Sequence, residues 1–142
     1  MTIGAILKDK GGEVLGIAPT ATVREAVTML AERRIGAVPV VDDGRVAGIF
    51  SERDVIYCLA REGAAALDRL LREVMTTPVQ TVTSADAVIA ALSLMTKRRI
   101  RHLPVADGGR LVGFVSIGDL VKYRIDRIEA DAAAMRDYIQ QV

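Results

Sequence analysis

The chain has 142 residues, of which 19 are Lys or Arg and 18 are Asp or Glu, so its formal net charge is +1. A chain this close to neutrality gains no affinity for nucleic acids or acidic membranes from net charge alone. Hydrophobic residues make up 51% of the sequence and aromatic residues only 4%. This composition predicts an aliphatic core and few rings on which bases could stack. A single cysteine implies no intrachain disulfide, and no apolar run is long enough for a signal peptide or a membrane span, so we expect a cytoplasmic protein with no membrane partner.

The N-terminal part of the chain predicts a strand followed by a helix. Residues 14–18 form a short apolar run that is typical of a strand. Thr22 and Glu25 then form a capping-box pattern, and the apolar residues after it share one helical face. We expect this helix to end near Arg33 and Arg34.

A hairpin and a second helix follow. Residues 37–42 and 45–50 are rich in β-branched side chains and flank Asp43-Gly44, a pair that favours a two-residue turn. Ser51 is placed to cap the next helix, and Gly63 is placed to stop it. The first half of the chain therefore predicts the order strand, helix, strand, strand, helix.

The second half of the chain repeats the first. Residues 35–54 match residues 100–119 without a gap, and Pro39, Gly48 and Ser51 each recur 65 positions later. Chance similarity of two aliphatic segments would not keep such different residue types in register. The matching elements are a strand at 79–82, a helix opening near Asp86, strands at 102–106 and 110–115 around Gly108-Gly109, and a helix after Ser116.

The duplication predicts an α+β (mixed α/β) fold of two pseudo-symmetric β-α-β-β-α repeats packed through their sheets, with a long C-terminal helix. A single copy would be marginally stable, because a domain this small leaves too much apolar surface in water. We divide the chain into a first repeat with the N-terminal segment (1–63), a linker with at least one helical turn (64–74), a second repeat (75–123) and a C-terminal helical extension (124–142).

The most informative motif is glycine, hydrophobic, any residue, serine, two residues and aspartate, at residues 48–54 and again at 113–119. In both places a strand ends and a helix begins. The free N–H groups of a helix start attract an anion, to which the hydroxyl of Ser51 or Ser116 could add a hydrogen bond. The carboxylate of Asp54 or Asp119 could accept hydrogen bonds from a ribose diol. Phosphate and ribose together indicate a nucleotide. The alternative is that both motifs only cap helices.

The doubled unit, with its hydrophobic-Pro-Val segment, Asp/Gly turn and closing motif, resembles a tandem pair of cystathionine beta-synthase (CBS) domains, a Bateman module, over roughly residues 7–123. The resemblance implies a stand-alone regulatory module that binds AMP, ADP, ATP, NAD or NADH, or less readily S-adenosylmethionine, between the repeats and signals to a protein target. It also implies composite clefts. One would take Phe114, Ser116 and Asp119 with Lys10, Val14, Leu15, Ile35 and Gly36. The other would take Ile49, Ser51 and Asp54 with Met75, Val79, Gln80, Ile100 and Arg101.

The two clefts are unequal in sequence, because Arg101-His102 stands where the first copy has Gly36-Ala37. We include both basic residues among the candidate ligand contacts and expect the clefts to prefer different ligands. Residues 97–99 are basic as well, but they close a helix, where cations complement the dipole, so nucleic-acid binding is a weak alternative. Cys58 is expected to be a small buried residue. No metal-site or catalytic pattern is present, so we expect no metal, no catalytic cofactor and no enzymatic activity.

The last helix carries apolar residues at alternating intervals of four and three: Val121, Ile125, Ile128, Ala132, Met135, Ile139 and Val142. This spacing is that of a heptad seam. It favours self-association through this helix, or docking of a target. The resemblance implies that the CBS modules also pair, so we expect a homodimer formed through the CBS modules and this helix. Two alternatives remain, a helix that folds back on its own domain and a purely structural dimerisation protein without a ligand.

Overall fold

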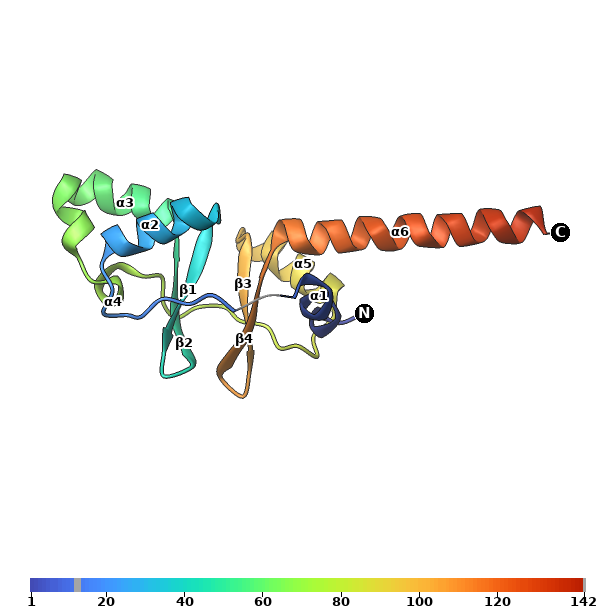
Figure 1. Ribbon diagram of the computed structural model, residues 1–142, viewed down its shortest axis with the longest axis horizontal. Helices are drawn as coiled ribbons and strands as arrows, with labels where there is room; N and C mark the ends of the chain where they lie inside the picture. Colours follow the sequence, from blue (N-terminus) through green and yellow to red (C-terminus); the bar gives the residue numbers. More distant parts are fainter. Residues whose placement is uncertain (12–13, 142) are drawn as a thin grey trace.

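Two antiparallel hairpins form the central sheet. In the computed structural model, which describes residues 1–11 and 14–141, β1 (Ala37–Asp42) pairs with β2 (Arg45–Ser51) and β3 (His102–Asp107) with β4 (Arg110–Ser116). The strand order is β1-β2-β4-β3, and the inner strands β2 and β4 meet at Arg45 and Arg110 (Figure 1). Both predicted turns are confirmed. Their central residues, Asp43-Gly44 and Gly108-Gly109, all have positive φ, as the tight turns of hairpins require.

The predicted leading strands at 14–18 and 79–82 are wrong as strands, because each is reduced to a single bridge. Ile17 pairs with Val40, and Val82 pairs with Val105, both in parallel. Extending either ladder by two residues toward the N-terminus would need an N–H donor at Pro39 or Pro104, which proline lacks. The same repeated proline therefore prevents both pairings from extending toward the N-terminus.

The helices begin and end largely where the sequence predicts. They are α2 (Val23–Arg33), α3 (Glu52–Glu62), α5 (Val88–Arg98) and α6 (Ile117–Gln140). The Thr22 hydroxyl accepts a hydrogen bond from the Glu25 N–H, and α3 ends at Gly63 with φ of 63°. The linker contains a 3₁₀ helix, η1 (Gly63–Asp68), and the short α4 (Leu71–Val74), which confirms its expected helical turn.

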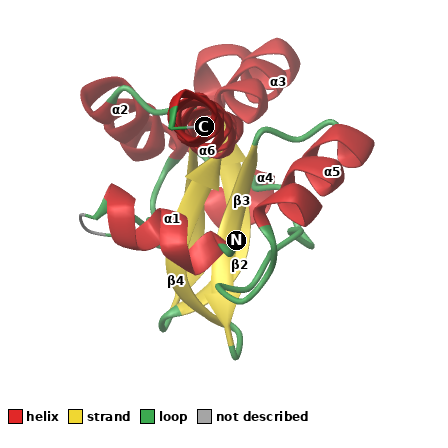
Figure 2. Cartoon of the chain, turned by 90° about the vertical axis from the view of Figure 1, so that its right-hand side faces the viewer, coloured by secondary structure: helices red, strands yellow, loops and turns green. Residues whose placement is uncertain are grey.

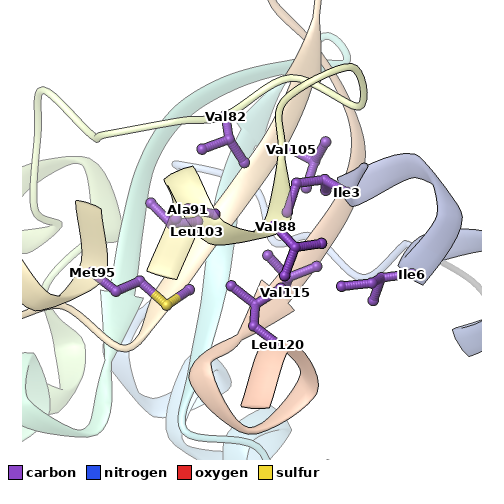
Figure 3. Close-up of a cluster of buried hydrophobic side chains, with 10 residues drawn as sticks. All are labelled: Ile3, Ile6, Val82, Val88, Ala91, Met95, Leu103, Val105, Val115 and Leu120. Carbon is purple, nitrogen blue, oxygen red and sulfur yellow. The ribbon is translucent and has the colours of Figure 1, made fainter. Parts of the chain in front are cut away.

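One helix was not predicted, and it crosses from one repeat to the other. α1 (Ile3–Lys10), which we grouped with the first repeat, buries Ile3 and Ile6 in the core of the second, among Val88, Val115 and their neighbours (Figure 3). In exchange, Leu71 of α4 is fully buried in the core of the first repeat. Each half of the chain therefore completes the core of the other half.

The long helix α6 starts on the second repeat and then leaves it. Figure 1 shows α6 projecting from the module, and Figure 2 looks along it from its C-terminal end. Its residues from Arg124 to Gln141 are exposed except for Ala133, which is half-buried. The alternative of a helix folded back on its own domain is thus wrong. Val142, the last residue of the predicted seam, lies outside the described residues. Among the described helices, none is long and apolar enough to cross a membrane.

Candidate ligand-binding clefts

Both serine-aspartate motifs form reciprocal caps at the starts of α3 and α6. The Ser51 N–H donates to Asp54 Oδ2 at 2.9 Å, and the Asp54 N–H donates back to Ser51 Oγ at 3.3 Å. The corresponding distances for Ser116 and Asp119 are 2.9 and 3.1 Å. The capping role considered from the sequence is therefore present in both copies, and a ligand would meet carboxylates that are already held in place.

The cleft beside Asp119 is a cavity of about 210 Å³ built from both repeats. Its lining contains five of the predicted contacts, Lys10, Val14, Leu15, Ile35 and Phe114, together with Leu7, Gly11, Ala37, Pro39, Val112 and Gly113. The motif glycine Gly113 allows Leu7 to pack directly on the β4 backbone, because a methyl group on Gly113 would lie 2.5 Å from the Leu7 side chain. Mostly apolar walls with a few polar groups at the edge are typical of a small-molecule site.

Lys10 lines this cavity and forms an ion pair with Asp119, which, like Ser116, is not itself one of the lining residues. Lys10 Nζ donates to Asp119 Oδ2 at 2.9 Å and to the Phe114 carbonyl at 3.1 Å. Partial burial disfavours the charged form of Asp119, but the hydrogen bond from the Ser116 N–H and the charge and hydrogen bond of Lys10 outweigh burial and lower the pKa of Asp119. Asp119 is therefore an ionised acceptor at neutral pH, as binding a diol would require.

His102 lies beside Gly36 and next to Phe114, and neither His102 nor Gly36 is among the described residues that line the cavity. Its ring stacks on Phe114 with centroids 5.7 Å apart. A methyl group on Gly36 would lie 2.7 Å from Glu52 Oε1 of the same repeat and 3.2 Å from His102 Cε1 of the second repeat. The two repeats therefore approach each other closely at Gly36 and His102. Burial lowers the pKa of His102, against the opposing effect of the Glu52 and Asp119 charges. At pH 7 the His102 ring, which stacks on Phe114, is therefore neutral.

The cleft beside Asp54 is covered by residues 75–77. The Thr76 hydroxyl donates to Asp54 Oδ1 at 3.0 Å, and the backbones of Thr76 and Ile49 exchange two hydrogen bonds of 2.9 and 3.1 Å. Met75 lies on Gly48, where a methyl group would come within 2.7 Å of its sulfur. Ser51 N–H and Oγ bond to Asp54 Oδ2, so both carboxylate oxygens of Asp54 are engaged within the protein.

Of the predicted contacts of the Asp54 cleft, Ile49, Ser51, Asp54 and Met75 take part in the contacts just described, and Val79, Gln80, Ile100 and Arg101 stay predictions. In the described part of the chain, no hydrogen bond or ion pair joins Val79, Gln80, Ile100 or Arg101 to Ser51 or Asp54. Ile100 packs on the second core, and the Arg101 carbonyl accepts from the Ile117 N–H. Sequence reasoning missed Thr76 and Leu7. The sequence signal for these contacts was the pair of matched glycines, Gly48 and Gly113, which leave room for another segment to pack against the strand.

A wider hollow of about 350 Å³ opens next to Val14, between the hairpins. Its lining consists of Val14, Gly16, Ile17, Ala18, Val41, Gly44 and Leu111. None of these side chains can carry a charge or donate a hydrogen bond. The Asp119 cleft is therefore the better candidate site, although it is smaller.

The remaining predicted features have structural roles. Lys97 and Arg98 lie in the last turn of α5 and are exposed, as expected for cations at a helix C-terminus. Cys58 is buried in the first core, and burial, followed by the charge of Asp54, raises the pKa of its thiol. Among the described residues, no three His, Cys, Asp or Glu side chains are grouped in a way that could hold a metal ion.

Comparison with known proteins identifies the family. The model of the CBS domain matches this chain twice, at residues 5–61 and 71–126. The chain therefore belongs to the CBS domain family and contains a tandem pair of these domains.

Solved structures of CBS pairs share this fold. A CBS-domain-containing protein of Agrobacterium tumefaciens is 39% identical, with a TM-score of 0.81, over 87% of this chain and 99% of its own. A CBS domain protein of Pyrobaculum aerophilum, 30% identical with a TM-score of 0.74 over 84% and 89% of the two chains, was solved with AMP. The CBS domain pair of protein MJ0100, 25% identical with a TM-score of 0.78 over 89% and 98%, was solved with 5′-methylthioadenosine and S-adenosyl-L-methionine.

Proposed function

We propose that this chain is a regulatory module that binds an adenosine-containing ligand between its repeats without transforming it. The observation that carries this proposal is the cavity of about 210 Å³ that both repeats line, with the Lys10–Asp119 ion pair at its edge. AMP in one related CBS protein, and 5′-methylthioadenosine and S-adenosyl-L-methionine in another, support the ligand class. The ligands we expect are AMP, ADP, ATP, NAD or NADH, with S-adenosylmethionine less favoured.

The residues of the Asp119 cleft divide between the parts of such a ligand. Val14, Leu15 and Ile35 offer an apolar surface to the adenine base. Asp119 would accept from the ribose hydroxyls, and its Oδ1 has no hydrogen-bond partner among the described residues. Lys10 and the start of α6 would attract phosphate, because both present positive charge.

The difference between the clefts supports unequal ligand preference. Asp119 is paired with a cation that a phosphate could attract away, whereas Asp54 is held by the neutral Thr76 hydroxyl under a segment bonded to β2. Opening the Asp54 cleft would break backbone hydrogen bonds as well as the Thr76 contact. We therefore expect the Asp119 cleft to bind phosphorylated ligands first and more tightly.

Ligand binding would be transmitted through α6. Asp119 lies in the first turn of that helix, and Lys10 is the last residue of α1, which packs against it. A ligand that pulls Lys10 from Asp119 would favour one arrangement of α1, α6 and the two repeats over another. A protein target that contacts α6 would then experience the change.

Thermal unfolding with AMP, ADP, ATP, NAD, NADH and S-adenosylmethionine tests the proposal. A ligand at a hundred times its dissociation constant stabilises the folded state by about 2.7 kcal/mol, which raises the Tm by several degrees. Asp119→Asn keeps the size of the side chain and removes its charge. We expect this variant to lose most of the ligand-induced shift.

Thr22→Ala is the matched control, because it removes the cap of α2, away from both clefts, at a cost of about 1 kcal/mol. It should lower the Tm and leave the ligand-induced shift unchanged. The absence of a shift with all six ligands, or an equal shift in Asp119→Asn, would contradict ligand binding at this cleft.

A structural dimerisation protein is the second candidate. The specific observation in its favour is that both serine-aspartate pairs already act as reciprocal helix caps. If caps are their whole role, Asp119→Asn and Thr22→Ala will lower stability alike and no adenosine ligand will change either protein.

A further inference from the structure

The projecting part of α6 carries an apolar stripe on which nothing packs. Ile125, Ile128, Met135 and Ile139 are between 48% and 64% exposed, and each lies three or four residues from another apolar position. In heptad lettering, Ile125, Ala132 and Ile139 occupy a, while Val121, Ile128 and Met135 occupy d. An exposed apolar stripe of this length is typical of a surface that a second surface covers.

The stripe faces away from the module that anchors the helix. α6 packs on the second repeat through Leu120, which is fully buried, and the half-buried Tyr123. At about 100° per residue, Leu120 and Tyr123 lie roughly 100° and 160° around the helix from Val121. The second repeat therefore leaves the stripe open to a second copy, even at the base of the helix.

The charges beside the stripe match a second copy in one orientation. The g positions hold Arg124, Asp131 and Tyr138, and the e positions hold Lys122, Glu129 and Arg136. In a parallel pair, each g residue lies beside the following e residue of the other helix. Arg124 then faces Glu129 of the second copy, and Asp131 faces Arg136, so both of these pairs are of opposite charge.

We propose that α6 pairs with α6 of a second copy of this chain as a parallel, in-register coiled coil. An antiparallel pair over the same length places e beside e and g beside g. Glu129 would then still face Arg136, but Asp131 would face Tyr138 and Arg124 would have no partner. The small Ala132 at the central a position allows two helices to approach closely, whereas three or more would enclose a cavity there. The pairing does not depend on ligand binding.

Disulfide cross-linking of the full chain reports directly whether the two α6 helices are parallel. Met135 occupies a d position, so Met135→Cys places two thiols side by side only when the helices are parallel and in register. We expect mild oxidation to yield a covalent dimer of Met135→Cys. Ala130→Cys, on the opposite side of the helix at position f, is the matched control and should stay monomeric, as should the wild-type chain with its buried Cys58.

Charge reversal tests the same contacts without touching the stripe. Arg124→Glu with Arg136→Glu makes positions 124, 129, 131 and 136 all acidic, and Glu129→Arg with Asp131→Arg makes these four positions basic. Each double variant, in the Met135→Cys background, should cross-link poorly alone, and the equimolar mixture should recover the dimer. The control Asp126→Arg with Asp137→Arg, at positions b and f, should cross-link like the parent.

The noncovalent measurement is sedimentation equilibrium of the chains without the added cysteine. We expect a monomer–dimer equilibrium whose dissociation constant rises by about tenfold or more in either charge-reversed variant, a change equivalent to about 1.4 kcal/mol. All substituted side chains are exposed, and circular dichroism verifies that the helix is retained. A monomeric wild type, a larger oligomer, cross-linking of Met135→Cys only with Ala132→Cys, or no response to charge reversal would each overturn the proposal.

Discussion

Asp54 and Asp119 occupy matched positions in the sequence, yet their side chains meet different partners. The Asp119 carboxylate is paired with Lys10, and its Oδ1 has no hydrogen-bond partner among the described residues, whereas the Asp54 carboxylate is bonded on both oxygens. The motif alone could not predict this difference, because Lys10 and Thr76 come from segments that lie outside it. A duplicated motif therefore marks two potential sites, and its neighbours decide which is accessible.

The two motif glycines should differ in their tolerance of a side chain. Gly48→Ala brings a methyl group within 2.9 Å of the Thr76 carbonyl, which is fixed by hydrogen bonds to Ile49, while Gly113→Ala meets only the end of the Leu7 side chain. We expect Gly48→Ala to lower the free energy of unfolding by about 1–3 kcal/mol and Gly113→Ala to lower it by less. Urea titration of both variants measures this. Equal losses would show that Leu7 is as rigid as the Thr76 backbone.

His102 should make stability depend on pH near neutrality. Burial lowers the pKa of His102 in the folded state below the value of about 6.5 in the unfolded chain. The unfolded state therefore binds more protons between these two values, and stability rises with pH across that window and is lost as the pH falls below about 6.5. We expect His102→Gln to flatten this part of the profile of unfolding free energy against pH. An unchanged slope in the variant would assign it to other groups.

Among the elements, the exchanged helices depend most on contacts distant in sequence. α1 has no side-chain cap, and the N–H groups of Ile3 and Gly4 donate instead to the carbonyls of Asp86 and Ser84. A capping pattern was therefore absent, and the sequence did not predict the helix. By contrast, Thr22, Ser51 and Gly63 predicted the bounds of α2 and α3 because those caps are local.

Truncating a buried side chain of α1 or α4 should weaken the core of the repeat on which that helix packs. Ile6→Ala removes a buried side chain from the second core, and Leu71→Ala removes one from the first; each should cost about 2–5 kcal/mol. In hydrogen exchange, Ile6→Ala should reduce protection mainly in α5, β3 and β4, and Leu71→Ala mainly in α2, β1 and β2. The two variants control for each other. Loss of protection in the repeat that adjoins the helix in sequence would contradict the exchange.

For the whole molecule, the register of residues 35–54 with 100–119 predicted two repeats, their hairpins and their helices. The resemblance to CBS pairs implied a composite cleft, and the cavity beside Asp119 is lined by Lys10, Val14 and Phe114. The sequence could not show that residues 75–77 lie along β2, or that Pro39 and Pro104 shorten the leading strands. These are consequences of packing between segments far apart in the chain.

The exchange of α1 and α4 bears on how the chain can be divided. Cutting the chain in η1, between α3 and α4, would separate α1 from the second core and α4 from the first core. Each fragment would then carry a helix that packs on the other fragment and would lack the helix that completes its own core. Two such fragments would each be poorly folded alone and would recover structure when mixed. The boundary at which the sequence repeats is thus not a boundary at which the protein separates, and its two halves are natural complements.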